Sequence, residues 1–384
     1  MLIAAIENFI FLNSLLTLFC FALAWIVRRT TERDRWRLHP QTFARFYTVM
    51  TIAPSAVSAW LIAAALLPEA WLGDAAFNAA HPAPLHQLHL LGELTATFEP
   101  ALSYVALSFA AAIALFAAVS SARGYLRVGS VIGRLEMNAA PPPPDQLALV
   151  ERIAAQRGLK VGLVMSDYPF SFVWGFRRST LVLSSGLLRI LSPEELAGVL
   201  EHEAAHHARR DNLIRLILNF CGCASLAFPL SRLIQRWRAE QIEMVCDEVA
   251  AGYTSAPLEI AEALVKLRRK TLLPAGNAAV TAYASSFIPD DSTGFARRVR
   301  QIIALTDAPP TPSRAKALSN PRKGRAIFIA AVFALTLAAA SALAPLGVHQ
   351  AAESLIQFIK YGTRENELLK DIDPGLGFHS MAGE

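Results

Sequence analysis

The sequence predicts a multi-pass α-helical membrane protein that carries one α+β domain. The 384 residues are 54% hydrophobic and only 17% charged, with a mean hydropathy of +0.37, which is too apolar for an ordinary soluble chain of this length. The segment that follows the third apolar stretch mixes helical and strand patterns, which indicates a folded domain. Four stretches are long enough and poor enough in charge to span a bilayer as helices, at residues 3–27, 49–67, 102–119 and 326–346.

Basic residues near these stretches predict the orientation. Arginines crowd the loop at 28–45, whereas residues 68–100 contain no Lys or Arg. Basic residues also follow the third stretch and precede the fourth, so we expect the first loop and the domain to be cytoplasmic and both termini to lie outside. The same clusters account for a pI of about 9.1, so direct binding of nucleic acid is not expected.

The domain begins after a polyproline spacer at 141–144. Residues 145–157 have a helical pattern, and 161–165 and 180–184 have the composition of short strands. Between the strands, 170–175 is apolar and extended. A strand edge here could accept substrate as an added strand, or the segment could form an internal hairpin, and the pattern does not decide between them.

A histidine pair in the pattern H-E-A-A-H, at 202–206, is the strongest chemical signal. On a helix, positions i and i+4 share a face, so His202 and His206 can both direct a ring nitrogen at one metal ion, with Glu203 beside them. The preceding residues predict where this helix begins, since Ser192 is an N-cap, Pro193 suits the first helical position and Glu195 completes a capping box. We expect the helix to run through residue 210.

A second helix, predicted at 237–250, places Glu243 and Asp247 on one face. Glu243 would complete a site of two histidines and one glutamate for Zn²⁺, with water in the fourth position. Asp247 could hold the other ring nitrogen of a ligand histidine, the alternative being a solvated carboxylate. With Glu203 as the general base, such a site is typical of peptide hydrolysis.

The segment at 213–230 is ambiguous, because it is apolar yet interrupted by polar and helix-breaking residues. Glu243 must return to the same metal as His202, so we expect a helix and turn packed on the domain or touching the membrane surface. A shallow hydrophobic hairpin in the membrane stays open. No disulfide is expected, and Cys221, Cys223 and Cys246 are interpreted as packing residues.

The motifs resemble the M56 family of bacterial membrane metallopeptidases, which contains the β-lactam-responsive BlaR and MecR signal transducers. Residues 202–206, then Arg210-Asp211 and the run E-M-V-C-D at 243–247, look like that family's elements, and the Cys-Asp pair favours it over the related Ste24/HtpX group. The resemblance implies a gluzincin-like zinc peptidase of the bacterial inner membrane, with the ligands and base named above. It also matches Arg298 to a basic position after the catalytic core, although a surface or lipid-facing arginine is an equal alternative.

These predictions divide the chain into four parts. They are an N-terminal membrane region at 1–140, a cytoplasmic zinc metallopeptidase domain at 141–320, a fourth transmembrane helix at 321–348 and a short exterior tail at 349–384. The tail is too short for a large folded domain, so direct sensing of a β-lactam is not expected.

By the same resemblance, the expected function is signalling by cleavage of a winged-helix transcriptional repressor or another specific protein. One alternative is a Ste24/HtpX-like protease for the quality control of membrane proteins. Another is a non-catalytic membrane sensor or scaffold. The expected partners are a protein or peptide substrate and the lipid bilayer. Formation of a homodimer, the inducing signal and self-cleavage stay open.

Overall fold

A computed structural model describes residues 2–32, 39–66, 141–175, 179–223, 225–271, 292–307 and 310–319, and single positions 108, 111, 112, 115 and 119. Apart from those single positions, the membrane stretch expected at 102–119 lies outside the described residues. The stretch expected at 326–346 and the tail at 349–384 also lie outside them.

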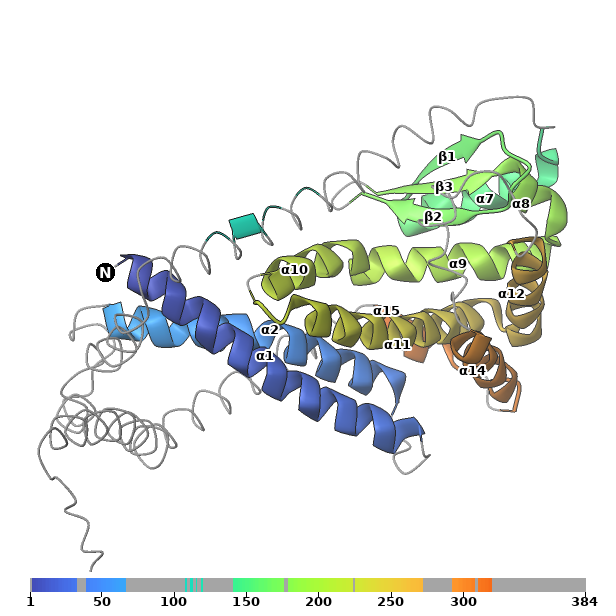
Figure 1. Ribbon diagram of the computed structural model, residues 1–384. Coiled ribbons are helices and arrows are strands. Elements are labelled where there is room, and N and C mark those ends of the chain that lie inside the picture. The colour runs from blue at the N-terminus through green and yellow to red at the C-terminus, as the bar shows by residue number, and fades with distance from the viewer. Residues whose placement is uncertain are drawn as a thin grey trace, which may run out of the picture.

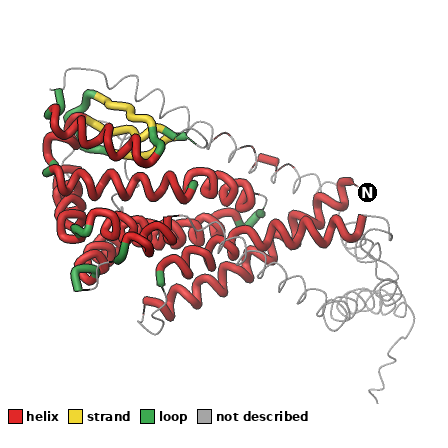
Figure 2. Tube along the Cα trace, turned by 180° about the vertical axis from the view of Figure 1, so that it is seen from behind, coloured by secondary structure: helices red, strands yellow, loops and turns green. Residues whose placement is uncertain are grey.

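The described elements stack in successive layers (Figure 1), with a small sheet at one end, then α9, then α11, and the pair α1 and α2 on the far side of α11. Seen from behind, the strands lie together at one end and helices make up the other layers (Figure 2). The elements are α1 (Leu2–Glu32), α2 (Pro40–Leu66), α7 (Pro144–Arg157), β1 (Lys160–Val164), β2 (Ser171–Trp174), β3 (Thr180–Ser184), α8 (Ser185–Ile190), α9 (Pro193–Arg209), α10 (Asp211–Cys223), α11 (Phe228–Thr254), α12 (Pro257–Thr271), α14 (Ser292–Ala304) and α15 (Pro312–Ser319).

The sheet has the strand order β1-β3-β2, with β1 parallel and β2 antiparallel to β3. The helix expected at 145–157 and the two expected strands are confirmed, each end agreeing within a residue or so. The apolar segment at 170–175 is β2. It forms a hairpin with β3 and, among the described strands, also lies at an edge of the sheet, on the side that packs against α9.

Helix α9 begins and ends as its local sequence predicts. The Ser192 side chain accepts a hydrogen bond from the Glu195 amide, and the Glu195 carboxylate accepts one from the Ser192 amide. Its C-cap, Arg210, has a left-handed φ of 56°. Leu196, Val199 and Leu200 are buried in the main core beneath the sheet, so this face of the helix is fixed by packing.

The ambiguous segment at 213–230 forms α10, a turn and the start of α11. The expected helix and turn are therefore confirmed. Gly222 lets the two helices approach closely, because a Cβ there would come 2.5 Å from the Ser231 hydroxyl oxygen. The outer face of α10 exposes Leu216, Ile217 and Phe220.

The N-terminal helices pack against the domain rather than standing apart from it. Among the described residues, one stretch is long and apolar enough to cross a membrane by length and composition, Leu12–Thr30 of α1. Phe43 and Tyr47 of α2 are buried against Ile234 of α11, with Trp237 beside them. The helix that carries Glu243 and Asp247 is thus supported from the N-terminal region.

Candidate metal centre

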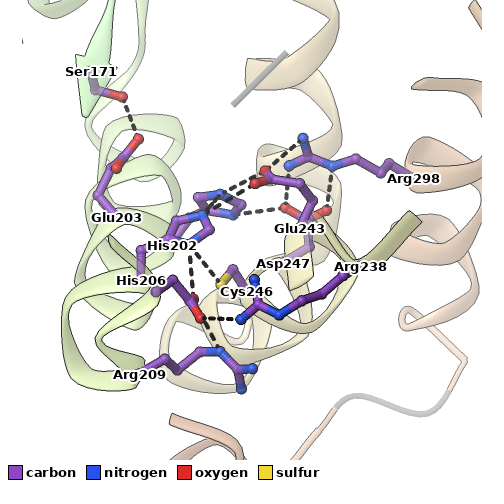
Figure 3. Close-up of polar contacts among 11 residues, drawn as sticks. Ser171, His202, Glu203, His206, Arg209, Arg238, Glu243, Cys246, Asp247 and Arg298 are labelled. Atoms are coloured by element: carbon purple, nitrogen blue, oxygen red, sulfur yellow. Dashed lines mark hydrogen bonds and ion pairs between the residues drawn. The ribbon is translucent and has the colours of Figure 1, made fainter. Parts of the chain in front are cut away.

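Three side chains from α9 and α11 converge on one point between the two helices (Figure 3). The Nε2 atoms of His202 and His206 lie 3.2 Å apart. One carboxylate oxygen of Glu243 is 3.4 Å from Nε2 of His202, and the other is 3.4 Å from Nε2 of His206. Ligand atoms at the corners of a tetrahedron around zinc stand about 3.3 Å apart. The spacing of these three groups therefore fits a zinc ion.

The carboxylates on the far side of each ring support the same conclusion. Nδ1 of His202 contacts a carboxylate oxygen of Asp247 at 2.9 Å, and Nδ1 of His206 contacts one of Asp211 at 3.1 Å. Each Nδ1 therefore carries a proton in the neutral ring, and each Nε2 presents a lone pair. Two lone pairs and a carboxylate that face one another repel unless a cation lies among them.

The deeper histidine is fixed by a short ion-pair unit. His202 is 0% exposed, and its partner Asp247 accepts hydrogen bonds from Nε and Nη2 of Arg298 at 2.8 and 2.7 Å. Nη1 of the same guanidinium lies 3.1 Å from Glu243. Arg298, on α14, therefore binds both carboxylates that α11 contributes, and it is buried rather than surface or lipid-facing.

The second histidine is fixed by a different set of residues. Asp211, the first residue of α10, lies 3.3 Å from Nε of Arg209 and 3.4 Å from Nη2 of Arg238. Cys246 Sγ is 3.6 Å from Nδ1 of His206, and this thiol is buried, as expected for a packing residue.

The electrostatics of the site favour positive charge between the helices. Burial alone would raise the pKa of Glu243, but the charges of His206 and Arg298 outweigh it and hold that pKa well below its usual range. Burial lowers the pKa of His202, but hydrogen bonds to Asp247 and Glu243 more than compensate, so its net pKa is raised. The pKa of His206 is likewise raised despite burial, by its contacts with Cys246, Glu243 and Asp211. A site that stabilises cationic rings in this way also suits a metal ion.

Glu203 lies one residue after His202 and faces the sheet. Its carboxylate accepts a hydrogen bond of 3.0 Å from the Ser171 hydroxyl of β2. The side chain is almost fully buried, and this burial raises its pKa above the ordinary value, although the neighbouring histidines oppose the shift. A carboxylate with a raised pKa is suited to accept and return a proton near neutrality.

The structure joins five of the six residues that the sequence singled out for this site by direct contacts, namely His202, His206, Glu243, Asp247 and Arg298. The sixth, Glu203, lies beside His202 on α9, and its carboxylate contacts Ser171 of β2. The residues that sequence reasoning did not assign are Ser171, Arg209, Asp211 and Arg238. Asp211 had a weak signal, an acidic residue at the start of an apolar helix just after the histidine motif. Ser171 and Arg238 reach the site only through packing between distant elements, whereas Arg209 lies on α9 itself, three residues after His206.

Comparison with known proteins gives a consistent family. A model described as Peptidase family M48 matches residues 147–322. A "Protease HtpX homolog" of Acidiphilium cryptum (strain JF-5) is 30% identical over 220 residues, covering 46% of this chain and 76% of that protein. The homolog of Gemmatimonas aurantiaca is 27% identical over 218 residues, covering 47% and 76%. That of Methanocaldococcus jannaschii is 40% identical over 75 residues, covering 18% and 26%. No solved structure matches the chain.

These matches correct the family expected from the motifs. The resemblance to the M56 family is wrong, because the match across the peptidase region is to family M48 and its HtpX proteins. The Cys246-Asp247 pair therefore does not identify the M56 family here. In the structure Asp247 contacts Nδ1 of His202, and Cys246 is buried next to His206.

Proposed function

The chain belongs to peptidase family M48 and is a metalloprotease, and on this premise we propose that it is a membrane-bound zinc endopeptidase that cleaves damaged membrane proteins. The single observation that carries the proposal is the convergence of His202, His206 and Glu243 at zinc-like spacing. The expectation that the chain cleaves a transcriptional repressor depended on the resemblance to the M56 family. Since that resemblance is wrong, the expectation has no support.

The residues around the three ligands supply the remaining requirements of peptide hydrolysis. His202, His206 and Glu243 would hold a zinc ion, which when bound would supply Lewis-acid polarisation of the scissile carbonyl. Glu203 accepts a proton from the attacking water and returns it to the leaving amine nitrogen. Ser171 holds one carboxylate oxygen of Glu203, which leaves the other oxygen available for the proton. Asp247 and Asp211 keep the two rings in the orientation that presents Nε2 to the metal.

Strand β2 lies at an edge of the described sheet, and this is where we place an extended peptide substrate. Ser184 donates its amide hydrogen to the Phe170 carbonyl, so by the alternation of an antiparallel pair the main chain of Ser171 and Val173 faces away from β3. The Val173 carbonyl already accepts a hydrogen bond from the Asn212 side chain. The main chain of Ser171, whose hydroxyl contacts Glu203, therefore marks where an added substrate strand would pass the catalytic carboxylate.

The membrane part of the proposal has separate support. The stretch Leu12–Thr30 can cross a bilayer, and its helix exposes large apolar side chains that include Phe19 and Ile26. Helix α11, which carries Glu243 and Asp247, packs against this N-terminal pair. A protease held this way meets substrates in or near the membrane, which favours membrane proteins over a soluble regulator.

The deciding experiment compares the wild-type chain with Glu203→Gln. Both are purified in nanodiscs for zinc content, and both are expressed in cells whose protein N-termini are identified by mass spectrometry. We expect equal zinc and at least about a hundredfold lower peptidase activity in Glu203→Gln. New N-termini in many membrane proteins should appear with the wild type alone.

Glu194→Gln is the matched control, because this exposed glutamate lies on the same helix but outside the site. It should behave like the wild type. New termini confined to one soluble protein would refute the quality-control role, and undiminished peptidase activity in Glu203→Gln would refute the mechanism.

A further inference from the structure

We propose that the N-terminal helix α2 positions the ligand His206 through Thr48, Arg238 and Asp211. The inference rests on the proposed function, because it requires His206 to bind the metal. By this inference, residues of the N-terminal region, outside the matched peptidase segment, set the affinity of the site for zinc. Gln41 and Arg209 form a second branch of the same path.

The last link of the path is the contact between Asp211 and the His206 ring. A carboxylate oxygen of Asp211 lies 3.1 Å from Nδ1, on the side of the ring opposite to the ligand nitrogen. An acceptor at this position fixes both the tautomer and the rotation of the imidazole, and loss of such a partner typically weakens metal binding by roughly 10- to 100-fold. Asp211 is therefore a positioning residue for this ligand.

The next link is a pair of buried arginines. Nε of Arg209 lies 3.3 Å from Oδ2 of Asp211, and Nη2 of Arg238 lies 3.4 Å from Oδ1. Both contacts are long for charge-assisted hydrogen bonds, which are usually about 2.7–2.9 Å. Asp211 thus does not determine alone where the two guanidinium groups lie.

The first link anchors these arginines to α2 by shorter bonds. Nε of Arg238 donates to the Thr48 hydroxyl oxygen at 2.9 Å, and Nη1 of Arg209 donates to the Gln41 side-chain oxygen at 2.8 Å. Arg209 also donates to the Leu318 carbonyl of α15 at 2.9 Å. The arginines are held more closely by these acceptors than by Asp211, so a shift of α2 would move the charges that orient Asp211.

A purely structural role explains this network less well. Two buried arginines around one aspartate cost desolvation free energy, and apolar residues of similar size often stabilise a fold as well or better. What the two arginines provide is a fixed orientation of Asp211, and Asp211 in turn orients the ring of the metal ligand His206.

The test compares Thr48→Val with Thr51→Val in the full-length chain in nanodiscs. Both threonines are buried on α2, and both hydroxyls donate to a main-chain carbonyl four residues earlier. Of the two hydroxyls, that of Thr48 also accepts a hydrogen bond from Arg238. The same isosteric substitution therefore removes the Thr48–Arg238 branch in one variant and leaves it in the other, and the Gln41–Arg209 branch is intact in both.

The readouts are the zinc dissociation constant, from competition with a chromophoric chelator, and the visible absorption of the Co²⁺-loaded protein. We expect Thr48→Val to weaken zinc binding by up to about tenfold, the range for one lost hydrogen bond, and to change the Co²⁺ spectrum. Thr51→Val should match the wild type in both. Asp211→Asn should weaken zinc binding by about tenfold or more.

The outcomes separate the two claims. Wild-type protein that binds no zinc would refute the proposed function. Zinc binding that is unchanged in Thr48→Val would overturn the inference alone, even if Asp211→Asn weakens it, as would an equal loss in Thr48→Val and Thr51→Val. If Asp211→Asn does not fold, the threonine pair decides the question by itself.

Discussion

The two histidines of the site are supported in different ways. His202 is fully buried, and its chain of partners, Asp247 and Arg298, is joined by contacts of 2.7–2.9 Å. His206 has a side chain 15% exposed, and its partners are joined by contacts of 3.1–3.4 Å. One ligand is held within α9, α11 and α14, whereas the other depends on α10 and, through two arginines, on α2.

The difference indicates which metal ligand is sensitive to the N-terminal helices. The short unit around His202 joins one ligand to Glu243 through side chains of α9, α11 and α14, because Arg298 binds both Asp247 and Glu243. The longer path to His206 is the part that a change in the membrane region can reach. The site is therefore stiff on one side and adjustable on the other.

Removing Arg298, which binds both carboxylates on the His202 side of the site, should have the largest effect on stability. Arg298→Met leaves the buried Asp247 and Glu243 charges without their shared partner, so we expect a loss of about 3–5 kcal/mol in the free energy of unfolding. Denaturant unfolding of the metal-free protein measures this. The neighbouring Arg297 side chain is 37% exposed and pairs with Glu240, so Arg297→Met should cost less than about 1 kcal/mol. Equal costs in the two variants would contradict the division described above.

A comparison of Asp247→Asn with Asp211→Asn sharpens the contrast at the ligands themselves. Each change weakens the acceptor on one ring. We expect a loss in zinc affinity of about a hundredfold for Asp247→Asn and of about tenfold for Asp211→Asn, because the contact to Asp247 is shorter and more buried. Chelator competition gives both values. A larger loss in Asp211→Asn would reverse the assignment of the stiff side.

The smallest effect is expected at Glu248, which joins the two regions. Its carboxylate lies 2.6 Å from Nε2 of His39, just before α2, and 2.7 Å from Nε of Arg314 on α15. Burial raises the pKa of Glu248, but hydrogen bonds and charges from His39 and Arg314 outweigh it and lower the pKa below its ordinary value of 4.5.

Because the folded pKa is the lower one, this carboxylate stabilises the fold above about pH 4.5, and the contribution is lost as the pH falls through the folded pKa. Glu248→Gln should therefore cost about 1 kcal/mol near neutrality and progressively less in acid. Thermal unfolding of both proteins from pH 7 to pH 3 checks this. A difference that does not change with pH would show that the carboxylate charge is not the cause.

Local sequence signals predicted the elements that carry the ligands. The capping box at Ser192 and the helical spacing of His202 and His206 depend on neighbouring residues only, so both could be anticipated. Glu243 and Asp247 stand one helical turn apart, and this spacing places them on the same face wherever the helix packs.

The supports of the ligands could not be derived in the same way. Asp211 follows His206 after the left-handed residue Arg210, so helical periodicity does not relate their positions. Ser171 and Arg238 come from elements that meet α9 only through tertiary packing. A five-residue motif is also too short to identify the family. The family is identified by similarity across residues 147–322.

The packing of α2 on α11 bears on how this protein can be dissected. A fragment that begins at the polyproline spacer would include the whole matched peptidase segment, yet it would uncover Ile234 and Trp237 and take the α2 acceptors away from Arg209 and Arg238. Such a fragment would expose an apolar face together with two poorly compensated charges. The smallest autonomous peptidase is therefore larger than the segment by which its family is recognised.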